Sequence, residues 1–231
     1  QPRFTRRLRE LLGQHPSVPA ERLGLEVLET SALEDLLRVS EVIRECRTFG
    51  VRFALDDFGT GYSSLTYLKR LPVAQLKIDQ SFVRDMLYDP DDLAILEGVI
   101  SLAAAFRREV IAEGVETVEH GEMLLQLGCE RAQGYGVARP MPGADFPGWA
   151  RDWRPIPAWQ HLAPIDRDDL PLLFSTVEHR AWIATLERHL ADKRSPQPAL
   201  DLHTCRFGAW LDADGRVRYG DQPVFQAVER L

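Results

Sequence analysis

Cysteine and long apolar runs are scarce in this sequence. The chain has 3 cysteines among 231 residues, a number that is odd and too small for a disulfide framework. No apolar run approaches the roughly 18 residues that a transmembrane helix requires, and no signal peptide opens the chain. The sparse cysteines fit a reducing compartment, and with no transmembrane or signal segment we expect a soluble, cytoplasmic protein. The chain can still belong to a longer parent protein that is anchored in a membrane.

Positive charge is in the minority, with 28 Lys and Arg residues against 35 Asp and Glu residues and a net charge of −7. This balance is poor for generic nucleic-acid binding and argues against a nucleic acid polymer as a partner. A phosphodiester ligand would need metal ions or local basic groups to offset the charge. The length, together with 45% hydrophobic residues, suffices for one domain or two small ones.

The most informative stretch is residues 51–79, in which two apolar runs enclose a glycine-containing loop and a helix-compatible segment. Asp56 and Asp57 follow the first run, and Lys77 stands near the end of the second. Strand, loop, helix and strand in this order predict a βαβ unit of a parallel sheet. An Asp-Asp pair offers the oxygen ligands of Mg²⁺, Mn²⁺ or Ca²⁺, although after a strand it is more often a turn or a helix cap.

The same arrangement recurs elsewhere, because Glu26, Glu113 and Gln133 each follow a short apolar stretch. Charged groups at the carboxyl ends of parallel strands are where α/β barrels keep their chemistry. Each interval between the successive polar residues has room for one crossover helix and its loops, which places them at one barrel mouth. Recurrence therefore favours a metal site over an isolated turn.

Apolar periodicity and capping residues predict several helices, namely 3–13, Ser31 to Gly50, 92–107 and Thr117 to Gly128. Ser31 and Glu34 form a capping box, and Asp91 can cap the third helix. The arginines of the first helix are interpreted as its solvated face. Strands are expected to end near residues 26, 56, 79, 113 and 133, whereas a complete barrel has eight strands.

A composition break at residues 154–157, followed by prolines and aspartates, predicts a linker over 154–169. We expect one domain over residues 1–153 and a separate helical segment over 170–231. Apolar residues repeat at helical spacing from 170 to 192 in that segment.

Five segments of the first domain resemble, in order, the motifs of EAL domains, which are cyclic di-GMP phosphodiesterases built on a variant TIM barrel. The segments are LEVLET at 25–30, DDFGTGYSSL at 56–65, LKID at 76–79, AEGVET at 112–117 and QGY at 133–135. The resemblance covers residues 1–150 and implies an α/β, TIM-barrel-like fold. The family's Glu-Ala-Leu signature and Asn metal ligand have no match here and are expected upstream, so the barrel is expected to lack its first strands.

The resemblance also implies a role for each polar residue. Glu26, Asp56, Asp57 and Glu113 correspond to the ligands of a two-metal site for Mg²⁺ or Mn²⁺, with Asp57 on the second metal. Two metals about 4 Å apart can clamp the attacking and departing oxygens of a phosphodiester. Lys77 corresponds to the lysine that orients or deprotonates the attacking water, and nearby cations would disfavour its ammonium form.

Three further residues take supporting roles by the same resemblance. Glu116 corresponds to a catalytic carboxylate that supports the water or a metal, and Gln133 to an amide that lines the site. Glu29 corresponds to the glutamate that braces the loop from Asp57 to Tyr62. The residues alone support an alternative for Glu29 equally well, which is a favourable charge at a helix N-terminus.

The helical segment resembles a truncated chemoreceptor zinc-binding (CZB) domain, a small helical bundle with a His-and-Cys zinc site. The matching features are HRAW at 179–182 and CRFGAW at 205–210. The resemblance implies a partial Zn²⁺ site at His179 and Cys205, and the two histidines expected on the last helix do not appear before Leu231. The alternative is a helical hairpin with an ordinary buried cysteine.

The sequence leaves competing functions open. The first is a metal-dependent phosphodiesterase that hydrolyses cyclic di-GMP to linear pGpG, and the second is a catalytically inactive cyclic di-GMP receptor. A zinc-sensing regulatory tail is a third. Without the first strands the sheet would have open edges, so these residues alone are expected to be inert and to form a homodimer or to rely on upstream domains.

Overall fold

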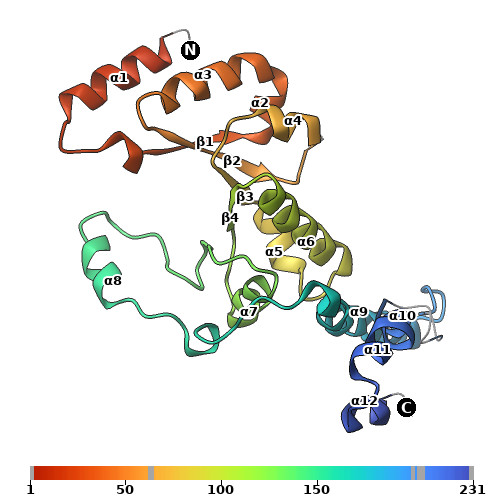
Figure 1. The fold of residues 1–231 in the computed structure, drawn as a ribbon. Helices are drawn as coiled ribbons and strands as arrows, with labels where there is room; N and C mark the ends of the chain where they lie inside the picture. Colours follow the sequence, from red (N-terminus) through yellow and green to blue (C-terminus); the bar gives the residue numbers. More distant parts are fainter. Residues whose placement is uncertain (1–2, 62–64, 199–200, 202–205, 229–231) are drawn as a thin grey trace.

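The structure of the protein is a computed structural model that describes residues 3–61, 65–198, 201 and 206–228. Within these residues, parallel strands form a sheet in the order β1-β2-β3-β4 (Figure 1). The strands are β1 Gly24–Leu28, β2 Arg52–Phe58, β3 Gln75–Ile78 and β4 Glu109–Ala112. The parallel sheet with its helices, followed by a helical C-terminal segment, confirms the predicted α/β fold class.

Two details of the predicted strands are wrong. β1 and β2 continue past Glu26 and Asp56, so these residues lie inside their strands and not after them. The strand predicted to end near Gln133 is reduced to an isolated bridge to the end of β4. The chain leaves the sheet there because Gly134, at φ 150°, turns into close contact with the backbone of Val115.

Helices connect the strands and also form the C-terminal part of the chain. Those of the first part are α1 Phe4–Gln14, α2 Glu29–Glu34, α3 Leu36–Arg47, α4 Leu65–Arg70, α5 Gln80–Asp85, α6 Pro90–Ala105 and α7 Val118–Gln126. Those that follow are α8 Phe146–Asp152, α9 Leu170–Ala191, α10 Arg206–Trp210, α11 Arg216–Tyr219 and α12 Pro223–Val228. In Figure 1 α8 lies on a long excursion away from the strands.

The helix predicted from Ser31 to Gly50 is interrupted at Asp35. This residue leaves the helical region (φ −145°, ψ 70°), and its side chain accepts a hydrogen bond from the N–H of Arg38. Aspartate at such a position caps the following helix. One predicted helix is therefore two, α2 and α3.

Of the helix caps predicted for α6 and α7, the first is wrong and the second is correct. Asp89, and not Asp91, caps α6, because Pro90 occupies the first helical position, where proline needs no N–H partner. Thr117 caps α7 as predicted, since its hydroxyl accepts from the N–H of His120 at 3.1 Å.

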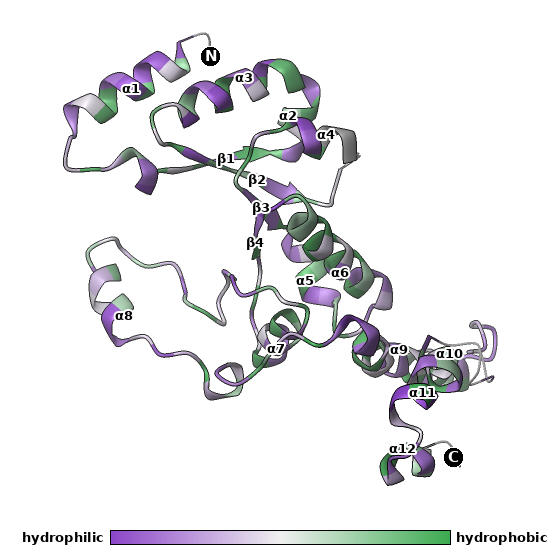
Figure 2. Ribbon diagram, viewed as in Figure 1, coloured by the Kyte–Doolittle hydropathy of each residue, from purple (hydrophilic) through white to green (hydrophobic). Residues whose placement is uncertain are grey.

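Helices cover one face of the sheet. α3 packs against β2, and α6 packs against β3 and β4. Phe53, Leu55 and Leu76 are buried in this layer. The hydrophobic character of α6, with Leu93 and Leu96 fully buried, is visible in Figure 2. The apolar core therefore lies between the sheet and these helices.

Polar side chains share the other face. The register pairs Glu26 with Ala54 and Ala54 with Gln75 in neighbouring parallel strands. Side chains alternate between faces along a strand, so Glu26, Asp56 and Lys77 point to the same side of the sheet. The alternation of side chains between the two faces of the sheet, more than the position of each strand end, therefore decides which polar residues lie close together.

Residues 154–169, predicted as a linker, pack against α7. The indole Nε1 of Trp159 donates to the carbonyl oxygen of Val118 at 2.9 Å. The ring lies so close to Gly121 that a Cβ there would be 2.3 Å from it. This part of the chain is therefore fixed to the first part by an aromatic contact.

The start of α9 belongs to the same core. Leu173, Phe174 and Val177 are buried in one apolar cluster with residues of α6. Across the described residues, no helix is both long and apolar enough to cross a membrane.

Candidate metal and catalytic site

Lys77, on β3, lies among three carboxylates that come from β1, from β2 and from the residue directly after β4. Its Nζ is 2.6 Å from Glu113 Oε1, 2.7 Å from Asp56 Oδ1 and 2.9 Å from Glu26 Oε1. The Lys77 side chain is only 6% exposed, whereas that of Glu26 is 52% exposed. The structure thus brings four of the predicted site residues into one cluster on the open face of the sheet.

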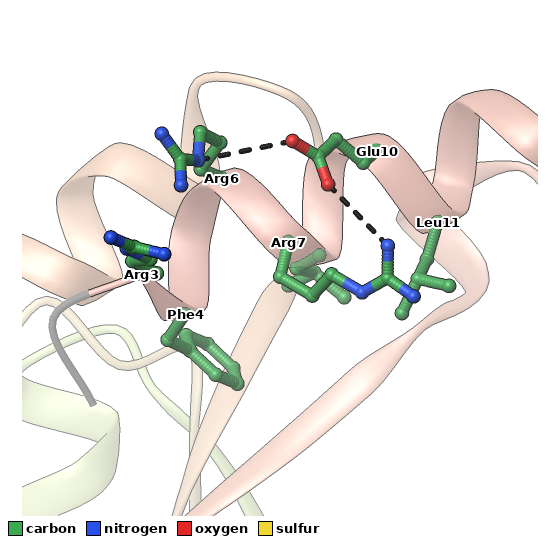
Figure 3. A pocket seen from close by; sticks show the side chains of 7 residues that line it. Arg3, Phe4, Arg6, Arg7, Glu10 and Leu11 are labelled. Carbon is green, nitrogen blue, oxygen red and sulfur yellow. Dashed lines mark hydrogen bonds and ion pairs between the residues drawn. The ribbon is translucent and has the colours of Figure 1, made fainter.

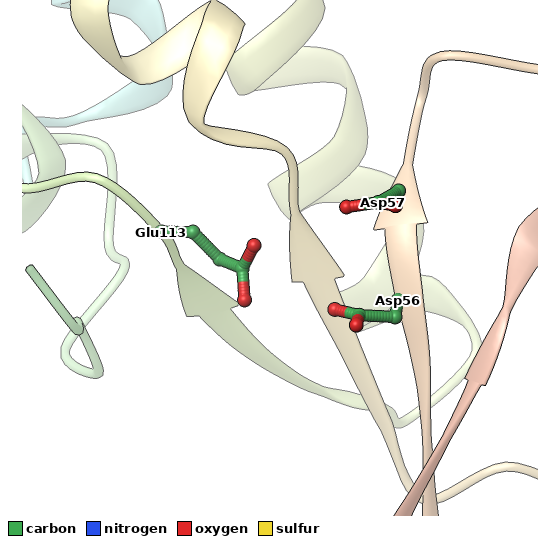
Figure 4. A group of neighbouring side chains, drawn as sticks. All are labelled: Asp56, Asp57 and Glu113. Carbon is green, nitrogen blue, oxygen red and sulfur yellow. The ribbon is translucent and has the colours of Figure 1, made fainter.

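Asp57 joins this cluster through an irregularity of β2. Neighbouring residues of a regular strand point to opposite faces, but the pairing of β2 with β3 shifts between Leu55 and Phe58, and Asp57 has φ 54°. Aspartate tolerates this left-handed conformation better than most residues. One oxygen each from Asp56, Asp57 and Glu113 therefore lies within 4.8 Å of the others (Figure 4).

These groups shift one another's protonation. Burial lowers the pKa of Lys77, but its hydrogen bonds to Asp56, Glu113 and Glu26 outweigh burial and hold that pKa above its usual range. Burial raises the pKa of both Asp57 and Glu113, and neighbouring carboxylates raise both further against the opposing charge of Lys77. This rise in the pKa of Lys77 is opposite to the fall predicted from the sequence for a lysine beside two bound cations. Negative charge is in excess here, and a bound cation would offset it.

Glu29 reaches from the first turn of α2 to the loop after β2. Its side chain is buried, at 1% exposure, and accepts from the N–H of Gly59 at 3.1 Å. Burial raises the pKa of Glu29, while backbone hydrogen bonds from Gly59 and Gly61 oppose the rise. Both sequence interpretations of Glu29 therefore have a structural counterpart, because it stands at a helix N-terminus and also contacts the loop. Tyr62, the end of that loop, lies outside the described residues.

Comparison with known proteins identifies the fold. A model of the EAL domain family matches residues 1–140. The chain belongs to the EAL domain family. A second model, of the chemoreceptor zinc-binding domain, matches residues 179–231. Both predicted resemblances are confirmed.

Curated relatives of this EAL domain include a protein named for cyclic di-GMP turnover and one named as an oxygen sensor. The chain is 42% identical over 135 residues to the bifunctional diguanylate cyclase/cyclic di-GMP phosphodiesterase MucR of Pseudomonas aeruginosa, covering 58% of the chain and 20% of that protein. It is 39% identical over 139 residues to the oxygen sensor protein DosP of Escherichia coli, covering 60% of the chain and 17% of that protein. The chain spans about a fifth of the length of these relatives.

Solved EAL structures share the fold. The EAL domain of Mycobacterium smegmatis DcpA superposes with a TM-score of 0.62 at 38% identity, covering 66% of this chain and 69% of that one. The PaMucR phosphodiesterase in complex with c-di-GMP superposes with a TM-score of 0.57 at 41% identity, covering 60% of this chain and 56% of that one.

Gln133 and Glu116 lie beside the carboxylate cluster of the EAL domain. Gln133 Nε2 donates to Glu113 Oε1 at 2.6 Å. Glu116 is exposed and, with Glu113 and Gln133, lines a hollow of about 630 Å³. Glu116 stands outside the group of oxygens formed by Asp56, Asp57 and Glu113. The hollow has room for a ligand next to the cluster.

Sequence reasoning assigned no role to two residues of this region. Asp79 caps α5 by accepting from the N–H of Ser81, and its nearby carboxylate raises the pKa of Asp57. Arg139 lines the hollow with its guanidinium 4.7 Å from the ring centroid of Tyr135. The position of Asp79 directly after β3 was a usable signal, whereas nothing local singles out Arg139.

The described structure includes one of the two predicted zinc residues, His179. His179 is exposed on α9 and stacks on Trp182, with ring centroids 6.1 Å apart. Cys205 lies outside the described residues, so its distance from His179 is not defined. The Trp210 indole, five residues further on, is buried and donates to Asp168 O at 3.0 Å.

A second hollow, of about 400 Å³, lies along α1 (Figure 3), and none of its lining residues belongs to the carboxylate cluster. Arg6 and Arg7 both pair with Glu10, at 3.8 and 3.4 Å, and all three side chains are at least half exposed. Exposed pairs of this kind contribute little to stability. This surface agrees with the solvated helix face predicted from the sequence.

Proposed function

We propose that this EAL domain is part of a metal-dependent phosphodiesterase that hydrolyses cyclic di-GMP to linear pGpG in bacterial second-messenger signalling. The observation that carries the proposal is the cluster of Glu26, Asp56, Asp57, Lys77 and Glu113 on one face of the sheet. The names of similar proteins, a cyclic di-GMP phosphodiesterase of Pseudomonas aeruginosa among them, support the substrate.

The donor set suits Mg²⁺ or Mn²⁺. These ions prefer carboxylate oxygens, and Asp56, Asp57 and Glu113 present such oxygens within 4.8 Å of one another. We assign Glu26, Asp56 and Glu113 to one ion and Asp57 to a second. When bound, two ions of this kind stabilise the attacking and departing oxygens of a phosphodiester.

The other side chains orient the reacting groups. Lys77 Nζ, buried against three carboxylates, is placed to hold the attacking water or to exchange a proton with it. Gln133 Nε2 fixes the orientation of the Glu113 carboxylate by its hydrogen bond. Glu116 faces the ligand-sized hollow, where a carboxylate can support the water. Glu29 holds the backbone of the loop that follows Asp57.

Turnover by the full-length protein expected to contain these residues tests this assignment, because these residues alone are expected to be inert. Cyclic di-GMP is incubated with Mg²⁺, Mn²⁺ or Ca²⁺, and pGpG is followed by chromatography. We expect product with Mg²⁺ or Mn²⁺ and inhibition by Ca²⁺, whose looser coordination fails to hold water in line. Asp56→Asn should abolish turnover, whereas Asp221→Asn, an exposed change near the C-terminus, should not.

Two results would reject the proposal. Turnover that persists in excess chelator or in Asp56→Asn would exclude the metal assignment. Binding of cyclic di-GMP with Mg²⁺ or Mn²⁺ present, but without any cleavage, would instead identify a receptor.

We also propose that the C-terminal segment binds Zn²⁺ with His179 and Cys205 among its ligands. The match of the chemoreceptor zinc-binding model to residues 179–231 supports this, as does the exposed position of His179. Competition with a chromophoric chelator measures the affinity. His179→Ala should weaken Zn²⁺ binding at least about tenfold, and the exposed His161→Ala should not; equal affinity of both variants would remove His179 from the site.

A further inference from the structure

The segment 113–117 connects β4 to α7 and carries two of the proposed site residues, Glu113 and Glu116. Its first half is held by backbone hydrogen bonds. The N–H of Glu113 donates to Ile78 O at 3.1 Å, and the carbonyl of Val115 accepts from Gly136 N–H at 2.8 Å. Val115 is fully buried. Glu113 is therefore fixed by the sheet itself.

The second half of the segment is held by a side chain. The N–H of Glu116 donates to Nδ1 of His120 at 3.4 Å. His120 is only 6% exposed, and its own N–H is bound by the hydroxyl of Thr117, the cap of α7. The imidazole thus connects the backbone of Glu116 to the first turn of the helix that follows.

This contact requires one tautomer of His120. An Nδ1 that accepts a hydrogen bond carries no proton, so the proton of the neutral ring is on Nε2. Burial lowers the pKa of His120, against the charges of Glu116, Glu119 and Asp85 and a backbone hydrogen bond at Gly114. A buried, neutral imidazole is consistent with the acceptor role.

We propose that His120 is a positioning residue of this site, which holds the backbone of Glu116 so that its carboxylate faces the hollow beside Glu113. The proposal rests on the proposed function, because Glu116 is given a role there. Within the described part of the chain, His120 is not itself among the residues that line the hollow or form the carboxylate cluster, so it acts through Glu116. Small displacements of supporting groups can cost catalysis much more than they cost binding.

Two variants separate the hydrogen bond from simple packing. His120→Leu fills the space without an acceptor, whereas His120→Gln keeps an oxygen acceptor. His15→Leu, at an exposed histidine after α1, is the matched control. With Mn²⁺ and cyclic di-GMP, we expect His120→Leu to lower kcat about tenfold or more with KM changed less than about threefold. His120→Gln should recover most of the lost kcat.

Amide hydrogen exchange gives a readout that does not depend on activity. Protection of the Glu116 amide should fall at least about tenfold in His120→Leu and persist in His120→Gln, while the Gly136 amide keeps its protection in both. In the unmodified protein, imidazole ¹⁵N spectra should place the proton of His120 on Nε2. That spectrum decides the contact even where His120→Leu does not fold.

The outcomes are distinct. Unchanged kcat in a folded His120→Leu, or a proton on Nδ1 of the unmodified protein, would overturn the positioning role. If the unmodified full-length protein fails to cleave cyclic di-GMP, the proposed function fails. Exchange at Glu116 and the ring tautomer then still report whether His120 holds the segment.

Discussion

Single residues in the site combine burial with charge. Lys77 is almost fully buried and is stabilised as an ammonium group by three carboxylates, whereas the buried carboxyl group of Glu29 accepts hydrogen bonds from backbone N–H groups. A buried charge is tolerated when it is paired and hydrogen-bonded. Both residues therefore depend on partners supplied by other elements, and both are sensitive to substitution.

Replacing Glu29 with alanine tests its role in the loop. The N–H groups of Gly59 and Gly61 lose a buried acceptor, so the loop that follows Asp57 should become less ordered. We expect kcat for cyclic di-GMP to fall about tenfold or more, while the Mn²⁺ concentration for half-maximal activity changes less than about threefold. Glu34→Ala, at an exposed glutamate on the same helix, is the control.

A normal kcat in Glu29→Ala would leave only the helix N-terminal charge as its role. Loss of all metal binding in Glu29→Ala would place Glu29 among the ligands instead.

Elements of the sheet are tied together at their amino ends by one carboxylate. Glu109, at the start of β4, accepts from Arg131 at 2.6 Å, Gln75 at 2.7 Å and Arg52 at 2.9 Å. These partners come from β2, β3 and the segment after α7. Burial raises the pKa of Glu109, but the contacts with Gln75, Arg131 and Arg52 outweigh burial and hold that pKa below its usual value.

The lowered pKa of Glu109 predicts a pH dependence of stability. The unfolded chain takes up a proton near the ordinary glutamate pKa of about 4.3, whereas the folded protein resists it. The stabilisation is therefore present above that value and is lost as the pH falls through the lower folded pKa. The partners are partly exposed, so the contribution is modest.

Urea unfolding at several pH values between about 3 and 6 measures this effect. Glu109→Gln should show a flatter dependence on pH in this window than the unmodified protein, and exposed Glu130→Gln should not. An identical slope in Glu109→Gln would show that its proton uptake is not linked to folding.

In the whole molecule, the C-terminal part and the EAL domain share buried surface. Trp159 packs on Gly121 of α7, and Phe174 and Val177 of α9 lie in the cluster that contains α6. Arg180 of α9 donates to Leu87 O at 3.5 Å, at the turn between α5 and α6. The helical segment therefore adds to the core of the domain that it follows.

Phe174→Ala tests this shared core. Phe174 is 2% exposed, and the guanidinium of Arg206 lies 4.0 Å from its ring centroid. Loss of a buried phenylalanine typically costs about 3 kcal/mol or more, so we expect a decrease of that size in the free energy of unfolding. Denaturation followed by circular dichroism measures it, with Ile183→Ala, 39% exposed on the same helix, as the control. Equal effects of the two variants would contradict a shared core.

Local patterns carried much of the prediction. Short apolar runs predicted the parallel strands, and their period of two places Glu26, Asp56 and Lys77 on one face once the register is known. Caps such as Thr117 were readable because they act over three residues. The family could also be predicted, because the order and spacing of its motifs can be read directly from a single sequence.

The sequence by itself determined the order of the strands along the chain, the polar residues that each delivers and the helical character of the C-terminal part. Only the tertiary structure decided that Asp57 turns toward the same face as Asp56, that the strand near Gln133 is a single bridge, and that residues 154–169 pack on α7. Each of these depends on contacts between residues far apart in the chain. A local pattern fixes which side of a strand or helix is apolar, but the close approach of separate backbones decides where a regular element breaks and what covers it.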